Sequence, residues 1–193
     1  MMLNLQGQGC HNINLVSPSH VVAQILAAVE LAAQEGLRLP LVYNTGGYDS
    51  LKALALLDGV IDIYMPDMKY GDSSTARQYS KVRDYVEVNQ TAVKEMRRQV
   101  GDLVLNEIGI AQRGLLIRHL VLPDNLAGTD KILEFIAREI SRNTYLNLMD
   151  QYHPCYRADE YPALNRPLTP AEYRAALNIA GAFKLDRLDA RCV

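Results

Sequence analysis

The sequence has no tryptophan and no strong excess of charge of either sign. Its 193 residues include 20 Lys and Arg against 22 Asp and Glu, which gives a formal net charge of -2. This balance leaves no basic stripe along the chain, so we expect no nucleic-acid partner. With 49% hydrophobic and 22% charged residues, the composition is typical of a folded domain and excludes a disordered chain, a collagen-like chain and a coiled coil.

Long hydrophobic runs are also absent. The most apolar helical stretch, residues 21–33, contains Gln24 and Glu30 and is too short to cross a bilayer. The first residues, Met1 to Asn4, lack the basic and apolar regions of a signal peptide. We therefore expect a cytoplasmic protein without a membrane partner.

Cysteine is scarce, and its spacing excludes several kinds of site. Cys10, Cys155 and Cys192 lie far apart and are odd in number. A disulfide framework is therefore not expected, and a reducing compartment is the natural interpretation. The three residues also lack the close spacing of a structural zinc site or of an iron–sulfur loop.

The hydrophobic pattern predicts strands of a parallel sheet alternating with helices. Strands are expected at residues 13–16, 39–43, 60–65, 115–122 and 144–149. Helices are expected from about 18 to 36, 50 to 57, 74 to 81, 90 to 100 and 129 to 141. A last helix opens at Thr169 with a capping box, and a short hairpin is expected within 106–114. We predict one α/β domain over 1–193, a partial barrel or an open sheet with about five parallel strands.

The beginning of the chain is unusual for such a fold. Residues 3–9 resemble the end of a helix that leads into the strand at 13–16. Five strand–helix units fall short of an eight-unit barrel, which typically needs ~250 residues. We therefore expect that the first strand–helix unit of a barrel is missing and that the strand at 13–16 has an open edge.

Polar residues follow the predicted strands at the end where ligands bind in parallel α/β folds. Each has a simpler explanation on its own, as a helix cap, a turn residue or a solvated side chain. Together they predict a site for a polar ligand that is anionic or zwitterionic. They include Ser17, Ser19, Asn44, Thr45, the Gly46-Gly47 turn, Asp67, Lys69, Arg118 and His153.

Several chemistries are disfavoured by missing motifs. The four histidines form no His-x-His or i, i+4 pair for zinc, and the Gly-x-Ser-x-Gly, Gly-x-Gly-x-x-Gly and phosphate-loop patterns are absent. Lys69 at a strand end leaves Schiff-base chemistry with a carbonyl substrate open.

At these strand ends the sequence resembles the radical S-adenosylmethionine enzymes, specifically the pyruvate formate-lyase activating enzyme group. The stretches that carry the resemblance are residues 9–20, 43–48, 64–70, 116–123 and 151–154. The resemblance implies a partial barrel of roughly six strands, which binds S-adenosylmethionine across its carboxyl-end face.

The resemblance also implies roles for individual residues. Ser17 and Ser19 stand where the family contacts the methionine amino group, although the family has Gly-Gly-Glu there. Asp67, Lys69 and Arg118 lie beside the ligand, and His153 lies near its adenosyl end. A monovalent cation is implied near Asn44, Thr45 and Met65, with Asn44 in place of the family's Asp.

One departure from the family concerns the defining Cys-x-x-x-Cys-x-x-Cys loop, which holds the [4Fe-4S] cluster. The loop would lie before Leu3, and Cys10 is no substitute, so we expect a truncated chain that is inactive alone. The complete protein would be an oxidoreductase. It would take an electron from a reducing donor, cleave S-adenosylmethionine and use the 5′-deoxyadenosyl radical on a substrate, such as a glycine in a partner protein.

Two alternatives remain at this point. The first is a Schiff-base lyase or aldolase on a partial barrel with Lys69 as the nucleophile. The second is a non-catalytic interaction domain, in which the open edge at 13–16 pairs with another chain.

Overall fold

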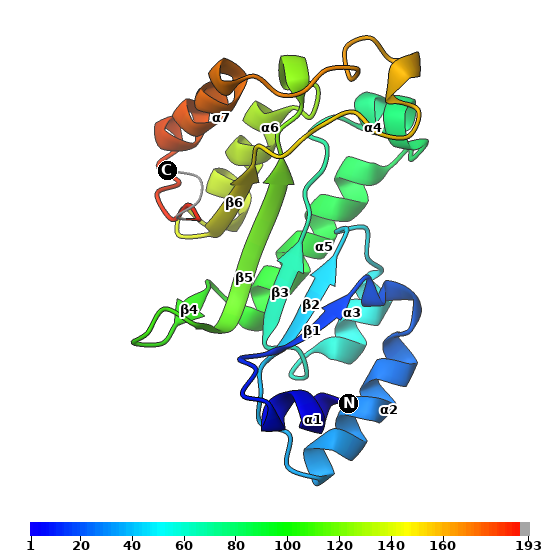
Figure 1. Cartoon of the computed structure of the whole chain (residues 1–193), viewed down its shortest axis with the longest axis vertical. Coiled ribbons are helices and arrows are strands. Elements are labelled where there is room, and N and C mark those ends of the chain that lie inside the picture. Colours follow the sequence, from blue (N-terminus) through cyan, green and yellow to red (C-terminus); the bar gives the residue numbers. More distant parts are fainter. Residues whose placement is uncertain (190–193) are drawn as a thin grey trace.

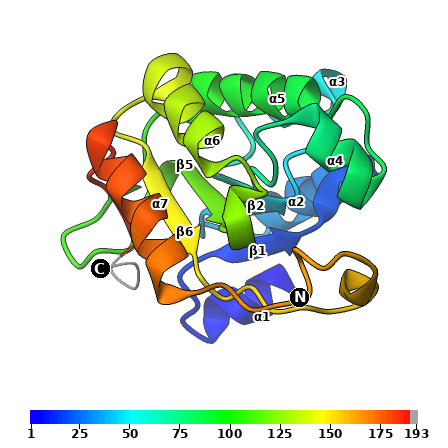
Figure 2. The same cartoon turned by 90° about the horizontal axis from the view of Figure 1, so that it is seen from above.

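The structure, a computed structural model, describes residues 1–189. Five parallel strands form one curved sheet, and helices cover its outer side (Figures 1 and 2). Helical crossovers join these strands, because parallel strands need a long connection. The strands are β1 (Ile13–Val16), β2 (Leu41–Thr45), β3 (Ile63–Pro66), β4 (Val104–Leu105), β5 (Ala111–Leu120) and β6 (Tyr145–Met149). The parallel strands follow one another in the order β1, β2, β3, β5 and β6.

The helices lie between the strands along the chain. The α-helices are α1 (Met2–Gly7), α2 (Val22–Gln34), α3 (Leu51–Leu57), α4 (Ser73–Ser80), α5 (Tyr85–Val100), α6 (Thr129–Phe135) and α7 (Pro170–Ala182). Shorter turns are η1 (Pro18–His20), η2 (Pro123–Asn125), the π-helical η3 (Ile136–Ile140) and η4 (Ala158–Glu160). Within residues 1–189, none of these helices has the length and apolarity needed to cross a bilayer.

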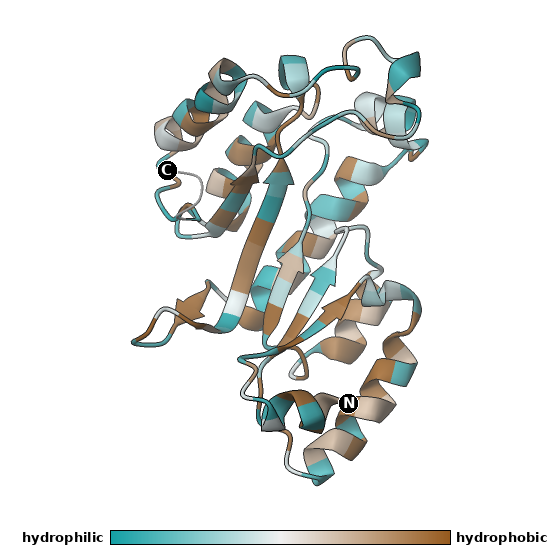
Figure 3. Cartoon of the chain, in the orientation of Figure 1, coloured by the Kyte–Doolittle hydropathy of each residue, from teal (hydrophilic) through white to brown (hydrophobic). Residues whose placement is uncertain are grey.

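The two faces of the sheet have different roles, because successive side chains of a strand point to opposite faces. Tyr43, Tyr64 and Ile117 lie on the outer face and are fully buried in the main core beneath the helices. Val42 and Ile63 lie on the inner face and form a smaller cluster with Leu103. Polar side chains lie near the carboxyl ends of β2, with Asn44, and of β5, with Arg118, as the teal segment just before the tip of β5 shows in Figure 3. The curved sheet thus carries a polar patch on its inner face.

The predicted α/β fold with about five parallel strands is confirmed, and so is the capping box of α7. The side chain of Thr169 accepts the N–H of Glu172, whose side chain accepts the N–H of Thr169. The hairpin expected within 106–114 exists, but its first strand, β4, lies just before that range and pairs antiparallel with β5.

The expected helix at 18–36 was wrong at its start. η1 comes first, and Val21, with φ of -133°, separates it from α2. The absence of a first barrel unit stays a prediction.

Candidate functional site

An ion-pair cluster lies where β3 and β5 end. Asp67 follows β3 directly and forms a parallel bridge with Arg118 of β5. The guanidinium of Arg118 donates to Asp67 Oδ1 from Nε at 2.9 Å and lies 2.7 Å from it at Nη2. The backbone also joins the two strands, since the Met68 N–H donates to the Arg118 carbonyl at 2.9 Å. Register in the sheet therefore brings these two side chains together.

Lys69 and Asn44 complete the cluster. Lys69 Nζ lies 2.6 Å from Asp67 Oδ2, and Arg118 Nη2 donates to Asn44 Oδ1 at 2.9 Å. Asp67 and Arg118 have side chains that are 15% and 25% exposed, whereas Lys69 is 49% exposed. Two cations share one carboxylate, so the cluster carries a formal charge of about +1 and attracts an anionic group.

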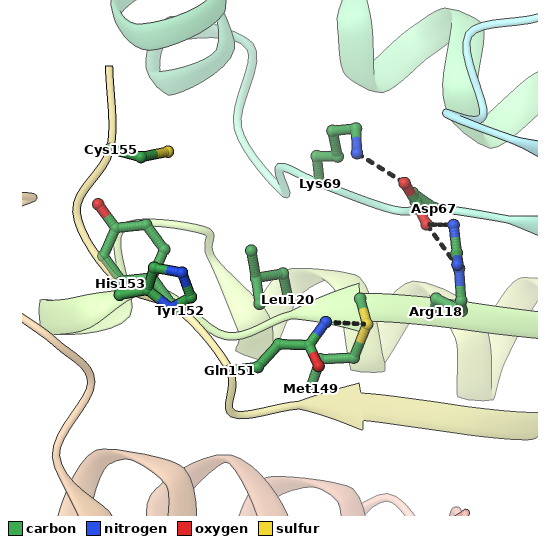
Figure 4. Close-up of a pocket in the computed structure, with 9 residues that line it drawn as sticks. All are labelled: Asp67, Lys69, Arg118, Leu120, Met149, Gln151, Tyr152, His153 and Cys155. Carbon is green, nitrogen blue, oxygen red and sulfur yellow. Dashed lines mark hydrogen bonds and ion pairs between the residues drawn. The ribbon is translucent and has the colours of Figure 1, made fainter. Parts of the chain in front are cut away.

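A cavity of about 410 Å³ extends from this cluster towards the segment after β6. Figure 4 shows the charged groups at one end of it and the rings of Tyr152 and His153 at the other. Leu120 and Met149 line the cavity with them. The hydroxyl of Tyr152 donates to the carbonyl of Leu164 at 2.7 Å, and burial raises the pKa of Tyr152. One end of the cavity thus fits charged groups and the other fits a flat, less polar group.

The Gly46-Gly47 turn is packed against this cluster. Gly47 has φ of +77°, and a Cβ there would lie 2.2 Å from the carbonyl oxygen of Asp67. Asn89 of α5 donates from Nδ2 to the carbonyls of Gly47, at 2.9 Å, and Asp67, at 3.0 Å. The turn is therefore more than a change of chain direction, because it positions the backbone of Asp67.

Ser19 and Thr45 do not join the cavity. The hydroxyl of Thr45 donates to Asp49 Oδ2 at 2.6 Å, and the hydroxyl of Ser19 donates to Asp49 Oδ1 at 2.7 Å. Thr45 and Asp49 are 4% and 3% exposed. Thr45 follows Asn44 on β2, so the two side chains point to opposite faces of the sheet.

The residues predicted to surround the monovalent cation also lie on different faces of the sheet. Asn44 and Met65 are register partners on β2 and β3 and share the inner face, whereas the hydroxyl of Thr45 is bound on the outer face. Ser17 is exposed at the end of β1, and its N–H donates to the Asn44 carbonyl at 2.9 Å. The structure thus brings Asp67, Lys69, Arg118 and His153 together around one cavity, with Asn44 behind them as a hydrogen-bond partner of Arg118, and places Ser19 and Thr45 elsewhere.

His119 faces away from the cavity, as alternation along a strand requires. Its ring contacts the carbonyl of Met68 at 2.7 Å and the hydroxyl of Thr129 at 2.9 Å. Burial lowers the pKa of His119 to about 4, so the ring is neutral at physiological pH. Through its contact with Thr129, the first residue of α6, His119 links α6 to the sheet.

The sequence analysis did not identify several residues that shape the site. Asn89 is fully buried among the apolar positions of α5, and Tyr85 of the same helix accepts the N–H of Lys69 at 2.8 Å. A polar residue on the apolar face of an amphipathic helix is the signal that predicts such a role for Asn89. Asp49 gives no such signal, because it lies in a polar turn.

The residues do not fit an iron–sulfur cluster. Within residues 1–189, no group of three or more His, Cys, Asp and Glu side chains is placed to hold a metal ion. Cys10 precedes β1 and Cys155 follows β6, so they lie at opposite ends of the parallel sheet. Cys192 lies outside the described residues.

Comparisons with known proteins support the fold. No family model matches the chain. An uncharacterized protein, MJ0674 of Methanocaldococcus jannaschii, is 32% identical over 176 residues, which cover 91% of this chain and 47% of that protein. The chain thus spans about half the length of this curated relative.

A solved structure, a domain of pyruvate-formate lyase-activating enzyme from Bacteroides vulgatus ATCC 8482, has a similar fold. The TM-score is 0.64, and the match covers 93% of this chain and 98% of that domain at 10% identity. The chain therefore shares the overall fold of this domain.

Proposed function

We propose that this chain is the S-adenosylmethionine-binding part of a radical S-adenosylmethionine enzyme of the pyruvate formate-lyase activating enzyme type. The observation that carries the proposal is the cluster of Asp67, Lys69 and Arg118, which opens into a cavity with Tyr152 and His153 at its far end. The similar fold of the pyruvate-formate lyase-activating enzyme domain supports it.

The donor set fits this cofactor. Arg118 and Lys69 pair with the carboxylate of the methionine moiety, and the oxygens of Asp67 and Asn44 accept from its ammonium group. The rings of Tyr152 and His153 hold the flat adenine between them and the cavity floor. Reductive cleavage of the bound cofactor would supply the chemistry for abstracting a hydrogen atom from a substrate.

The iron–sulfur cluster that would drive this cleavage has no ligands among the described residues, so no reaction step is assigned to it here. We propose that the ligands of the iron–sulfur cluster lie in a longer protein that contains this chain. That longer protein would receive an electron from a reducing donor and act on a protein substrate such as a glycyl-radical enzyme. The greater length of MJ0674 is consistent with this proposal.

The test begins with the genomic DNA upstream of Met1. We expect an in-frame Cys-x-x-x-Cys-x-x-Cys, and we expect the full gene product, after anaerobic reconstitution with iron and sulfide, to form 5′-deoxyadenosine and methionine. The absence of this motif, or a reconstituted full product that forms no 5′-deoxyadenosine, would overturn the proposal.

The Schiff-base alternative receives no support from the geometry. A nucleophilic lysine is activated by burial among apolar groups. Lys69 is half exposed and paired with Asp67, so that burial is missing. Borohydride trapping of a carbonyl substrate on Lys69 would revive this alternative.

A further inference from the structure

A second cavity of about 470 Å³ adjoins the first and shares Tyr152 and Cys155 with it. Five tyrosines line it, together with Lys81 at one side, and we call it the tyrosine groove. The segment after β6 runs across the carboxyl end of the sheet towards α4 (Figure 1). Residues of this segment and of α4 line the groove. The tyrosines are Tyr70, Tyr79, Tyr152, Tyr156 and Tyr161.

Contacts within the protein hold most of these rings in place. Tyr79 and Tyr161 form an edge-to-face pair with centroids 5.1 Å apart. The hydroxyl of Tyr70 lies 2.8 Å from the hydroxyl of Ser80, and Tyr152 is tied to Leu164. The walls are therefore preformed, so a ligand would not have to order them on binding.

The charge of the tyrosine groove is of one sign. Its lining includes Lys81 and Arg157 and no Asp or Glu. Glu160 already binds the guanidinium of Arg157, with two contacts of 2.6 Å. Lys81 Nζ donates to two neutral oxygens, the carbonyl of Gln78 at 2.8 Å and the hydroxyl of Tyr161 at 3.4 Å. Besides the guanidinium of Arg157, the charge of Lys81 helps to lower the pKa of Glu160, but among the described residues Lys81 forms no ion pair, so its ammonium is available to a ligand.

Backbone strain occurs at the rim. Tyr156 has φ of +54°, which is unfavourable for a bulky side chain, and it is 93% exposed. Strained residues of this kind cluster at ligand-binding sites. Tyr156 thus stands at the opening of a groove with aromatic walls.

We propose that the tyrosine groove binds a small organic anion with a flat apolar body, such as an aromatic carboxylate. The acid group pairs with Lys81, and the body lies against the tyrosine rings in offset or edge-to-face contact. That this ligand lies beside a bound cofactor rests on the proposed function. The binding itself does not.

The test uses the whole chain and two probes of similar shape, 2-naphthoate and its neutral analogue 2-naphthamide, titrated by calorimetry. We expect saturable binding of the naphthoate, at least ten times tighter than that of the amide. Lys81→Gln should weaken naphthoate about tenfold and leave the amide unchanged, whereas Tyr79→Leu should weaken both. Lys94→Gln, which removes a lysine of α5 that pairs with Glu139, is the matched control and should change neither.

Two results would overturn the proposal. One is that naphthoate does not bind measurably, binds no more tightly than the amide, or binds equally well to the Lys81→Gln variant. The other is loss of naphthoate binding in Arg118→Gln, which would place the probe in the first cavity. Naphthoate binding that depends on Lys81 in a protein that does not bind S-adenosylmethionine would leave the tyrosine groove standing and overturn only the proposed function.

Discussion

Arg118 holds Asp67 through two of its guanidinium nitrogens, 2.9 Å and 2.7 Å from the same carboxylate oxygen. The two residues come from neighbouring strands, and a third contact, from Arg118 to Asn44, extends the link to β2. One arginine thus ties together the ends of three strands and also forms the cation-rich end of the cavity. Changes to this pair should therefore alter both stability and ligand binding.

Asp67→Asn should reduce both properties. The change removes the carboxylate that Arg118 and Lys69 share, and charge-assisted hydrogen bonds of partly exposed groups contribute about 1–2 kcal/mol. We expect the free energy of unfolding, measured by urea denaturation, to fall by that amount. Affinity for S-adenosylmethionine should fall about tenfold, because the acceptor for its ammonium group is weakened.

Glu134→Gln is the control for this prediction. It removes the exposed ion pair between Glu134 and Arg138, which lies one helical turn further along the chain. Such exposed pairs contribute less than about 0.5 kcal/mol to the free energy of unfolding. Equal losses of stability in both variants would contradict the importance of the Arg118–Asp67 pair.

Arg118→Lys should not preserve the site. Arg118 reaches Asp67 and Asn44 at the same time, and the single ammonium of a lysine lacks the forked geometry for this. We expect S-adenosylmethionine to bind about tenfold more weakly, with far-ultraviolet circular dichroism unchanged. Binding as tight as in the unmodified protein would show that a point charge is sufficient.

Gly47→Ala and Gly46→Ala form a matched pair. A Cβ at Gly47 would lie 2.2 Å from the Asp67 carbonyl and 2.3 Å from Asn89 Nδ2, whereas a Cβ at Gly46 has its nearest neighbour 3.8 Å away. Gly47 also has a positive φ, which alone costs about 1–2 kcal/mol for other residues. We expect Gly47→Ala to lower the free energy of unfolding by at least about 2 kcal/mol and Gly46→Ala to change it by less than about 1 kcal/mol. A similar effect of both substitutions would contradict the close packing of this turn.

His119 should make the protein less stable as the pH falls. Burial lowers the pKa of His119 from 6.5 to about 4. Below pH 6.5 the unfolded chain binds a proton there that the folded chain does not bind, so acid favours unfolding. The loss from this residue should be roughly 2 kcal/mol between pH 7 and pH 5. Urea titrations across this range should show a shallower slope for His119→Gln, and identical slopes would contradict the assignment.

The sequence predicted the sheet well because short apolar strands and amphipathic helices leave strong periodic patterns. It also predicted that the residues following β3, β5 and β6 lie at one end, because parallel strands share an orientation. It could not separate Ser19 and Thr45 from the cavity, since that depends on which face of the sheet each side chain occupies. For Asn89 the sequence offers a signal, a polar residue on an apolar helix face, but the partners of Asn89 depend on how α5 packs against the Gly47 turn.

The start of α2 shows a second limit of prediction from the sequence. Pro18 is a favourable first residue of a helix, and the sequence therefore places the start there. In the structure Pro18 begins η1 instead, because the non-helical backbone of Val21, with φ of -133° and ψ of 29°, interrupts the helical path. Local preference predicts that a helix follows β1, and the tertiary structure determines where it begins.

The most direct test of the account is equilibrium dialysis of labelled S-adenosylmethionine against the chain and its Arg118→Gln variant, with Glu134→Gln as the control. We predict saturable binding at one site, at least tenfold weaker in Arg118→Gln and unchanged in Glu134→Gln. The absence of saturable binding at millimolar concentrations, or equal binding by all three proteins, would contradict the assignment of this cavity to S-adenosylmethionine.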